Sequence, residues 1–172
     1  MKLIMSDRPL SIPAENQNNT IRFIDLSALK IAGCTGCFGC WTKTPGRCVI
    51  RDDAARVYPL IAESEAVLYV SRIRYGGYDT CMKTMLERAI PIQQAFIRIH
   101  EGETHHVQRA VAPKQAVILA YGDISEESRA IFERLVERNA KNMSFVSWKI
   151  RFVEEAELES AVLSEVEQWE NA

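Results

Sequence analysis

Four cysteines are the most specific chemical feature of this sequence. Cys34, Cys37 and Cys40 follow one another at intervals of three, and Cys48 comes after a Pro-Gly turn. Glycines between the first three thiols let the backbone curl around a common centre. Compact runs of four thiolates ligate iron–sulfur clusters, whereas zinc more often takes its thiolates from two separated pairs. The spacing C-x2-C-x2-C-x7-C therefore favours iron over zinc, and reduced, unligated thiols in a glycine-rich turn are the open alternative.

The composition of the chain indicates the cellular compartment in which these thiols occur. The chain has 172 residues, 47% of them hydrophobic, and 21 basic against 23 acidic residues give a net charge of −2. Its apolar runs are too short for a signal peptide or a membrane helix, and its basic residues are not clustered as nucleic-acid binding requires. We expect one domain over residues 1–172, in the cytoplasm, where clustered thiols are more often ligands or redox groups than disulfides. Cys81 lies apart and is expected to be an ordinary buried residue.

The elements that position these residues follow from alternating patterns along the chain. Strand candidates occur at residues 3–5 and 21–26 and in the β-rich segment 144–153. Uninterrupted apolar runs, typical of strands covered on both faces, occur at residues 66–70 and 116–120. Helical apolar stripes occur at about residues 52–61, 79–89, 125–136 and 158–169, and Ser125 is predicted to cap the third. The alternation predicts an α/β, doubly wound parallel sheet. Ligands of such sheets bind beyond the carboxyl ends of the strands, which directs attention to residues 6–8, 71–78 and 121–123.

Two of these strand ends carry residues suited to a flat ligand. The turn after the third strand reads S-R-I-R-Y-G-G-Y over residues 71–78. Its glycines allow backbone amides to approach a ligand, and Tyr75 or Tyr78 can stack on a ring. The turn after the fourth strand, residues 121–123, is similar in kind. Each signal is weak when it is taken alone.

Taken together, these segments resemble a known family. The run over residues 34–53 reads C-x-G-C-F-G-C-W-T-K-T-P-G-R-C-V-I-R-D-D. It resembles the flavodoxin-like NAD(P)H-dependent FMN reductases, in particular the iron–sulfur flavoproteins. Tyr75 to Tyr78, with the Met-Lys at 82–83 and the Leu-Glu-Arg at 86–88, is similar to the family segment that follows the third strand. The resemblance covers Ile21 to about Asn142 and implies a five-stranded sheet of order 2-1-3-4-5 with FMN at its carboxyl edge.

The resemblance also implies an activity and a set of binding residues. FMN would accept a hydride from NAD(P)H and pass electrons to a small acceptor, in a homodimer or tetramer. Because the flavin carries this chemistry, no catalytic side chain is expected. The expected metal ligands of a [4Fe–4S] cluster are Cys34, Cys37, Cys40 and Cys48. The expected cofactor-binding residues are Ser6, Arg8, Thr20, Ser71, Arg72, Ile73, Arg74, Tyr75, Gly76, Gly77, Tyr121, Gly122 and Asp123.

The connection after the first strand departs from the family pattern. Relatives carry a phosphate loop of the form Ser-Pro-Arg…Ser-Asn-Thr followed by a full helix, whose N-terminus favours an anion. Here only Ser6-Asp7-Arg8 and Asn19-Thr20 match, and the second strand begins at Ile21. Residues 7–20 are enough for a crossover loop but not for a regular first helix. Asp7 also places a negative charge where a phosphate is expected.

The flavin loop is the second departure, and it leaves three functions open. The family pattern resembles Ser-Pro-x-Tyr, whereas this chain has S-R-I-R at residues 71–74. Arg72 and Arg74 would either replace the lost phosphate cradle electrostatically or mark weakened or absent flavin binding. The alternatives to a flavin oxidoreductase are a flavodoxin-like subunit without flavin, acting as a partner or scaffold, and an electron-transfer module that uses only the cysteines.

Two other polar groups are predicted to be structural. His105 and His106, expected on a helix or loop, point apart and are therefore poor ligands for one metal. Asp52 and Asp53 are predicted to cap a helix.

Overall fold

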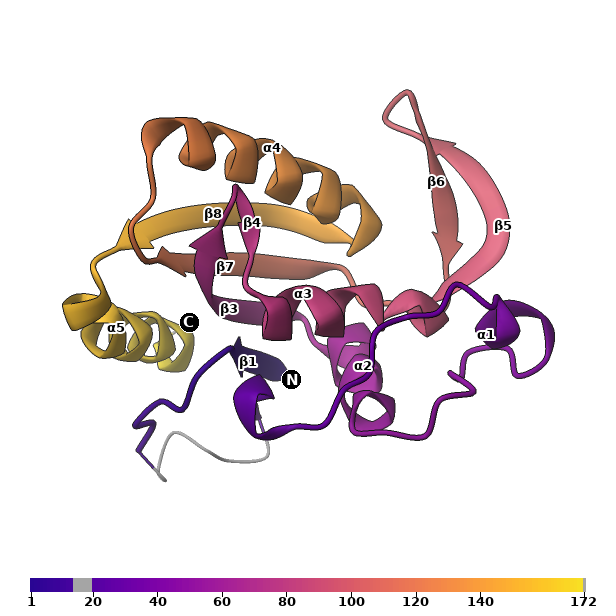
Figure 1. Ribbon diagram of the computed structural model, residues 1–172, viewed down its shortest axis with the longest axis horizontal. Helices are drawn as coiled ribbons and strands as arrows, with labels where there is room; N and C mark the ends of the chain where they lie inside the picture. Colours follow the sequence, from indigo (N-terminus) through magenta and orange to yellow (C-terminus); the bar gives the residue numbers. More distant parts are fainter. Residues whose placement is uncertain (14–19, 172) are drawn as a thin grey trace.

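Five parallel strands form the centre of the chain in a computed structural model that describes residues 1–13 and 20–171 (Figure 1). The strand order is β2-β1-β3-β7-β8, which confirms the predicted order 2-1-3-4-5. The strands are β1 (Lys2–Ser6), β2 (Ile21–Asp25), β3 (Ala66–Arg74), β7 (Lys114–Tyr121) and β8 (Phe145–Val153). A short strand, β4 (Gly77–Tyr78), folds back antiparallel on the end of β3.

The register of the parallel pairs aligns the carboxyl ends of three strands. Ser6 at the end of β1 pairs with Val70 of β3. Two residues further along β3, Arg72 pairs with Tyr121, the last residue of β7. The turns that follow β1, β3 and β7 therefore open at one edge of the sheet, as the sequence predicts.

Helices cover both faces of the sheet, three on one side and one on the other (Figure 1). They are α2 (Ala54–Glu63), α3 (Thr80–Glu87), α4 (Glu126–Asn142) and α5 (Leu158–Glu170). The 3-10 turns are η2 (Leu26–Ala28), η3 (Ile90–Ile92) and η4 (Glu155–Glu157). Capping residues begin two of the helices: Asp79 accepts from the Thr80 amide, and Ser125, the predicted cap, accepts from the Ser128 amide. No helix in the described part of the chain is both long and apolar enough to span a membrane.

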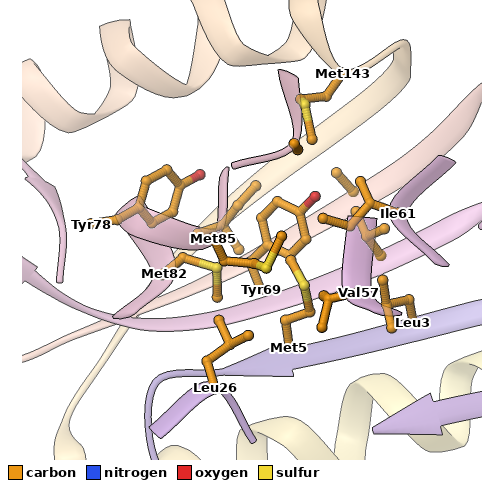
Figure 2. Packing of buried hydrophobic residues seen from close by; sticks show 14 of the residues in the cluster. Leu3, Met5, Leu26, Val57, Ile61, Tyr69, Tyr78, Met82, Met85 and Met143 are labelled. Carbon is orange, nitrogen blue, oxygen red and sulfur yellow. The ribbon is translucent and has the colours of Figure 1, made fainter. Parts of the chain in front are cut away.

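The core has two layers because successive residues of each strand point to opposite faces. Met5 and Tyr69 face α2 and α3, where Met82 and Met85 pack against them (Figure 2). The neighbouring residue Ile4 faces α5 with Leu68, Leu119 and others. Burial on both faces explains the uninterrupted apolar runs at residues 66–70 of β3 and 116–120 of β7.

The connection between β1 and β2 contains no helix in its described residues, 7–13 and 20. Leu10 and Ile12 pack instead against the apolar cluster beneath α5. The expectation that a regular first helix is missing is therefore met in these residues. Asn19, which belongs to the expected phosphate-loop fragment, lies outside the described residues.

A two-stranded hairpin, β5 (Gln93–His100) and β6 (Glu103–Gln108), extends beyond the sheet beside α1 (Gly39–Thr42) (Figure 1). The sequence analysis did not predict it. His105 and His106 lie on β6, not on a helix or loop as expected. The hairpin was missed because its exposed side chains include Phe96, Ile97 and Ile99, so apolar and polar residues do not alternate regularly along it.

Candidate functional site

Asp7 lies at the centre of the carboxyl edge and takes hydrogen bonds from two neighbouring strands. One carboxylate oxygen accepts from the Arg72 amide at 2.7 Å and from Ser71 Oγ at 3.2 Å. The other accepts from the Tyr121 hydroxyl at 2.8 Å. The donors at the ends of β3 and β7 are thus satisfied by a carboxylate of the chain itself. Ser6, which precedes Asp7, is fully buried and accepts from the Arg8 amide.

Burial and these contacts shift the pKa values of Asp7 and Tyr121. Burial raises the pKa of Asp7, and the hydrogen bonds from Tyr121, Arg72 and Ser71 offset part of that increase. Burial, followed by the adjacent Asp7 carboxylate, raises the pKa of Tyr121 far above its usual range. Tyr121 therefore remains a hydrogen-bond donor throughout the physiological range.

Two arginines converge on one carboxylate above the Tyr121 ring. Arg8 Nη1 lies 2.5 Å from Glu155 Oε1, and Arg72 Nη2 lies 2.7 Å from Glu155 Oε2. The guanidinium carbons of Arg8 and Arg72 lie 5.8 and 5.0 Å from the centre of the Tyr121 ring, which is cation–π distance. The hydrogen bonds from Arg72 and Arg8 lower the pKa of Glu155. We name Arg8, Arg72, Tyr121 and Glu155 the arginine clamp.

Sequence reasoning missed Glu155 because it lies 83 residues from Arg72 along the chain. The only available signal was its position just after the fifth strand, which also ends at the carboxyl edge. Arg74 takes no part in the clamp, since its Nε pairs with Asp79 at 2.8 Å. The two arginines that distinguish the flavin loop therefore act at separate places.

A cavity of about 410 Å³ lies beside the clamp, between the turns that follow β3 and β7. Five of its lining residues were expected at the site: Arg72, Ile73, Arg74, Tyr75 and Asp123. The other two are Ser125, which was expected only as the cap of α4, and Ser128 in the first turn of that helix, for which no role was expected. The structure thus brings together the two turns that the sequence singled out.

The two tyrosines of the turn after β3 differ in their exposure to solvent. Tyr75 is 99% exposed at the tip of the turn and lines the cavity. Tyr78, the other candidate for stacking, is buried and packs edge-on against Phe132 with ring centroids 4.9 Å apart. Gly76 has a φ of +72°, and a Cβ there would lie 2.5 Å from a side-chain carbon of Ile131. The turn therefore approaches α4 too closely for any other residue, and only Tyr75 is free to stack.

The remaining glycines shape the same two turns. Gly77 begins β4 and pairs with Arg74. Gly122 has a φ of +112°, and a Cβ there would lie 3.2 Å from Arg72 Cγ. A side chain at Gly122 would press on the arginine clamp.

The cysteine loop gathers its four thiols beside α1. Cys34 and Cys37 are exposed, whereas Cys40 and Cys48 are half-buried. Burial, and then the nearby Cys48 thiol, raise the pKa of Cys40, and Cys34 and Cys37 add to the effect. The backbone amide of Gly39 lowers the pKa of Cys37. Within residues 1–13 and 20–171, however, no three Cys, His, Asp or Glu side chains are arranged to hold a metal ion.

Two anchors hold this loop to the fold. Arg88 donates to the Ala32 carbonyl at 2.6 Å, just before the loop, and to Cys48 Sγ at 3.4 Å, at its end. On the other side, Trp41 Nε1 donates to the Gln93 carbonyl, and its ring lies 4.6 Å from that of His106. His106 thus has the structural role that was predicted.

Comparison with known proteins found no matching family model. Over 77 residues the chain is 38% identical to an iron–sulfur flavoprotein of Archaeoglobus fulgidus, and the matched segment covers 45% of this chain and 34% of that protein. Over 74 residues it is 28% identical to an iron–sulfur flavoprotein of Methanocaldococcus jannaschii, and the matched segment covers 43% of this chain and 37% of that protein. The chain thus matches about a third of the length of these curated relatives.

Solved structures share the whole fold. An FMN-dependent NADH-azoreductase from Bacillus anthracis, solved with FMN, superposes with a TM-score of 0.58 at 12% identity and covers 97% of this chain and 95% of that chain. An NAD(P)H:quinone oxidoreductase from Methanothermobacter marburgensis gives 0.60 at 12% identity with the same coverage. The chain therefore has the flavodoxin-like fold of these reductases.

One residue expected in the phosphate loop, Thr20, does not lie at the carboxyl edge. Thr20 precedes β2, and its carbonyl accepts from the Lys2 amide at the amino end of β1. Ser6 ends β1 four residues later, roughly 13 Å away at the rise of a strand. Because β1 and β2 are parallel, the residue before β2 must lie at the opposite edge of the sheet.

The described residues of this flavodoxin-like chain fit a flavin ring better than they fit its phosphate. The cavity beside Tyr75 has the size of a small-ligand pocket. At the phosphate end, Asp7 already takes the strand-end donors and Glu155 takes both arginines. An anion that took the place of Glu155 would contact both arginines of the clamp.

Proposed function

We propose that this chain is a flavin-dependent oxidoreductase that holds the isoalloxazine ring in the cavity between the turns after β3 and β7. The observation that carries the proposal is this cavity of about 410 Å³, bordered by a fully exposed tyrosine at the carboxyl edge of a flavodoxin-like sheet. We further propose FMN as its flavin. The flavin, when bound, would accept a hydride from NAD(P)H and pass electrons to a small acceptor.

The chain's own residues would bind and orient the ring. Tyr75 offers an aromatic face that no neighbouring group covers. Ser125 accepts from the Ser128 amide through its Oγ, so its hydroxyl hydrogen is left to donate to a ligand. The neighbouring side chains Arg72 and Arg74 are each paired with a carboxylate, so neither adds an uncompensated positive charge to the cavity wall.

Titration with FMN, followed by flavin fluorescence, tests this proposal. Tyr75→Ala is expected to weaken FMN binding roughly two- to tenfold, since a stacked aromatic pair contributes about 0.5–1.5 kcal/mol beyond the area that it buries. Phe96→Ala, which removes a 72% exposed ring on the hairpin, is the matched control and should bind as the unmodified protein does. If saturating FMN does not bind to the unmodified chain, the flavin-free subunit is the better description.

The cysteine loop supports a second proposal, that this chain also carries a [4Fe–4S] cluster. The support is the spacing of the four cysteines, the mutual effect of their thiols on the pKa of Cys40, and the 38% identity to an iron–sulfur flavoprotein. Four thiolates are the donor set that such a cluster requires.

Iron content measured after anaerobic purification tests the cluster. Cys37→Ser should lower iron per chain to background, because it removes one of four ligands. Cys81→Ser, a half-buried cysteine of α3 outside the loop, should leave iron unchanged. Equal iron in the Cys37→Ser variant and the unmodified protein would reject the cluster.

A further inference from the structure

Carboxylates of the chain itself hold the groups at the carboxyl edge that could bind an anion. Asp7 accepts the strand-end hydrogen bonds from β3 and β7, as described above. Glu155 places one oxygen on Arg8 and the other on Arg72. Two guanidiniums that converge on one pair of oxygens form the arrangement that carboxylates and phosphates prefer.

Glu155 reaches this position from a separate element. It begins η4, the short 3-10 turn that connects β8 to α5. The two arginines come from the ends of β1 and β3, and both lie over the ring of Tyr121 at the end of β7. Arg72 also lines the cavity proposed for the flavin ring. The arginine clamp is therefore continuous with the ring site, at the place where a charged tail of a ring ligand would extend.

The side-chain charges of the arginine clamp and the adjacent Asp7 sum to zero. The positive charges of Arg8 and Arg72 are matched by the negative charges of Asp7 and Glu155. A phosphate that arrived beside this neutral group would lose hydration without gaining a free cation. A phosphate that displaced Glu155 would gain both guanidiniums and break two existing ion pairs.

We propose that Glu155 is an internal occupant of an anion site and a specificity-determining residue for the flavin. The inference rests on the proposed ring site. As long as Glu155 occupies the clamp, the phosphate of FMN contributes nothing to affinity, so riboflavin, which has the same ring and no phosphate, binds as tightly as FMN. Removal of Glu155 creates a preference for the phosphorylated form.

The test compares dissociation constants of riboflavin and FMN for three proteins. For the unmodified chain the two constants should agree within about twofold. In Glu155→Ala, FMN should bind at least tenfold tighter than before, while riboflavin is unchanged. Glu157→Ala, on the same 3-10 turn, should behave as the unmodified chain. A tenfold preference of the unmodified chain for FMN, or an unchanged ratio in Glu155→Ala, overturns the proposal.

A second measurement separates this proposal from the ring site. Inorganic phosphate, with no ring, should raise the melting temperature of Glu155→Ala but not that of the unmodified chain. The double variant Arg8→Ala/Glu155→Ala should lose the effect. If phosphate stabilises Glu155→Ala and no flavin binds to any variant, the ring site fails and the anion site stands. If phosphate does not stabilise Glu155→Ala, the anion site fails whether or not flavin binds.

Discussion

Replacement of Arg88 by methionine is expected to lower the free energy of unfolding by about 3 kcal/mol. Arg88 is 1% exposed and forms a two-point contact with Asp52, with distances of 2.6 and 2.9 Å. Removal of one partner from a buried ion pair leaves an uncompensated charge, which costs about 3–5 kcal/mol. The Asp52 carboxylate keeps hydrogen bonds from the Ala32 and Ala54 amides, so we expect the lower end of that range.

Urea denaturation at neutral pH measures this effect, and the same helix supplies a control. Lys83 is an exposed residue of α3 whose ammonium lies 3.9 Å from Glu87. Lys83→Met should change stability by about 0.5 kcal/mol or less, as surface substitutions do. In a double-mutant cycle, Asp52→Asn should cost much less when Arg88 is already methionine. A loss below about 1 kcal/mol in Arg88→Met would show that the pair does not hold the fold.

The same substitution should also loosen the cysteine loop. Arg88 binds the Ala32 carbonyl before the loop and the Cys48 sulfur at its end, so a single guanidinium joins both ends. This role was not foreseen, although the Leu-Glu-Arg at residues 86–88 contributed to the resemblance. Arg88 lies 40 residues from Cys48 in sequence, and nothing in the local pattern marks a positive charge that will be buried.

The sheet could be predicted because its signal is local. Buried parallel strands require apolar residues on both faces, so the run from Ala66 to Val70 has almost no other interpretation. The start of α4 was equally accessible, since Ser125 accepts a backbone hydrogen bond where the sequence predicts a capping residue. The short connection of residues 7–20 predicted that a regular first helix does not fit, and its described residues, 7–13 and 20, contain none. These features depend on residues that are close together in sequence.

The hairpin and the arginine clamp could not be predicted for the opposite reason. The hairpin keeps Phe96 and Ile99 exposed, so burial does not impose on it the alternation by which a strand is identified. Glu155 belongs to the site only because β8 ends at the same edge as β1 and β3. Sequence reasoning did identify Asp7 as a negative charge near the phosphate position, but not that Tyr121 and the Arg72 amide would bind it.

A buried lysine at the other edge of the sheet gives the protein an unusual dependence of stability on pH. Lys114 begins β7 and is fully buried. Its ammonium donates to the Ala112 carbonyl at 2.5 Å and to the Met143 carbonyl at 3.4 Å. Burial disfavours the charged form and lowers the pKa of Lys114 to about 8, from an ordinary value of 10.5.

The sign of the effect follows from the number of protons bound in each state. Between pH 8 and 10.5 the unfolded chain keeps a proton on Lys114 that the folded chain releases, so stability rises with pH in this window. Below pH 8 both states are charged, and the full penalty of burial is present. One pKa unit corresponds to about 1.4 kcal/mol, so the shift contributes about 3 kcal/mol across the window.

Comparison with Lys114→Met isolates this residue from cysteines and tyrosines that titrate in the same range. The free energy of unfolding of the unmodified chain, minus that of Lys114→Met, should rise by about 3 kcal/mol between pH 7.5 and 10.5. Urea denaturation of both proteins at several pH values gives this difference. Lys149→Met, at a partly exposed lysine whose ammonium lies 2.9 Å from Glu165, serves as the control for replacement of a lysine elsewhere on the sheet. A flat curve for Lys114→Met would mean that the buried ammonium is solvated as well in the folded protein as in the unfolded chain.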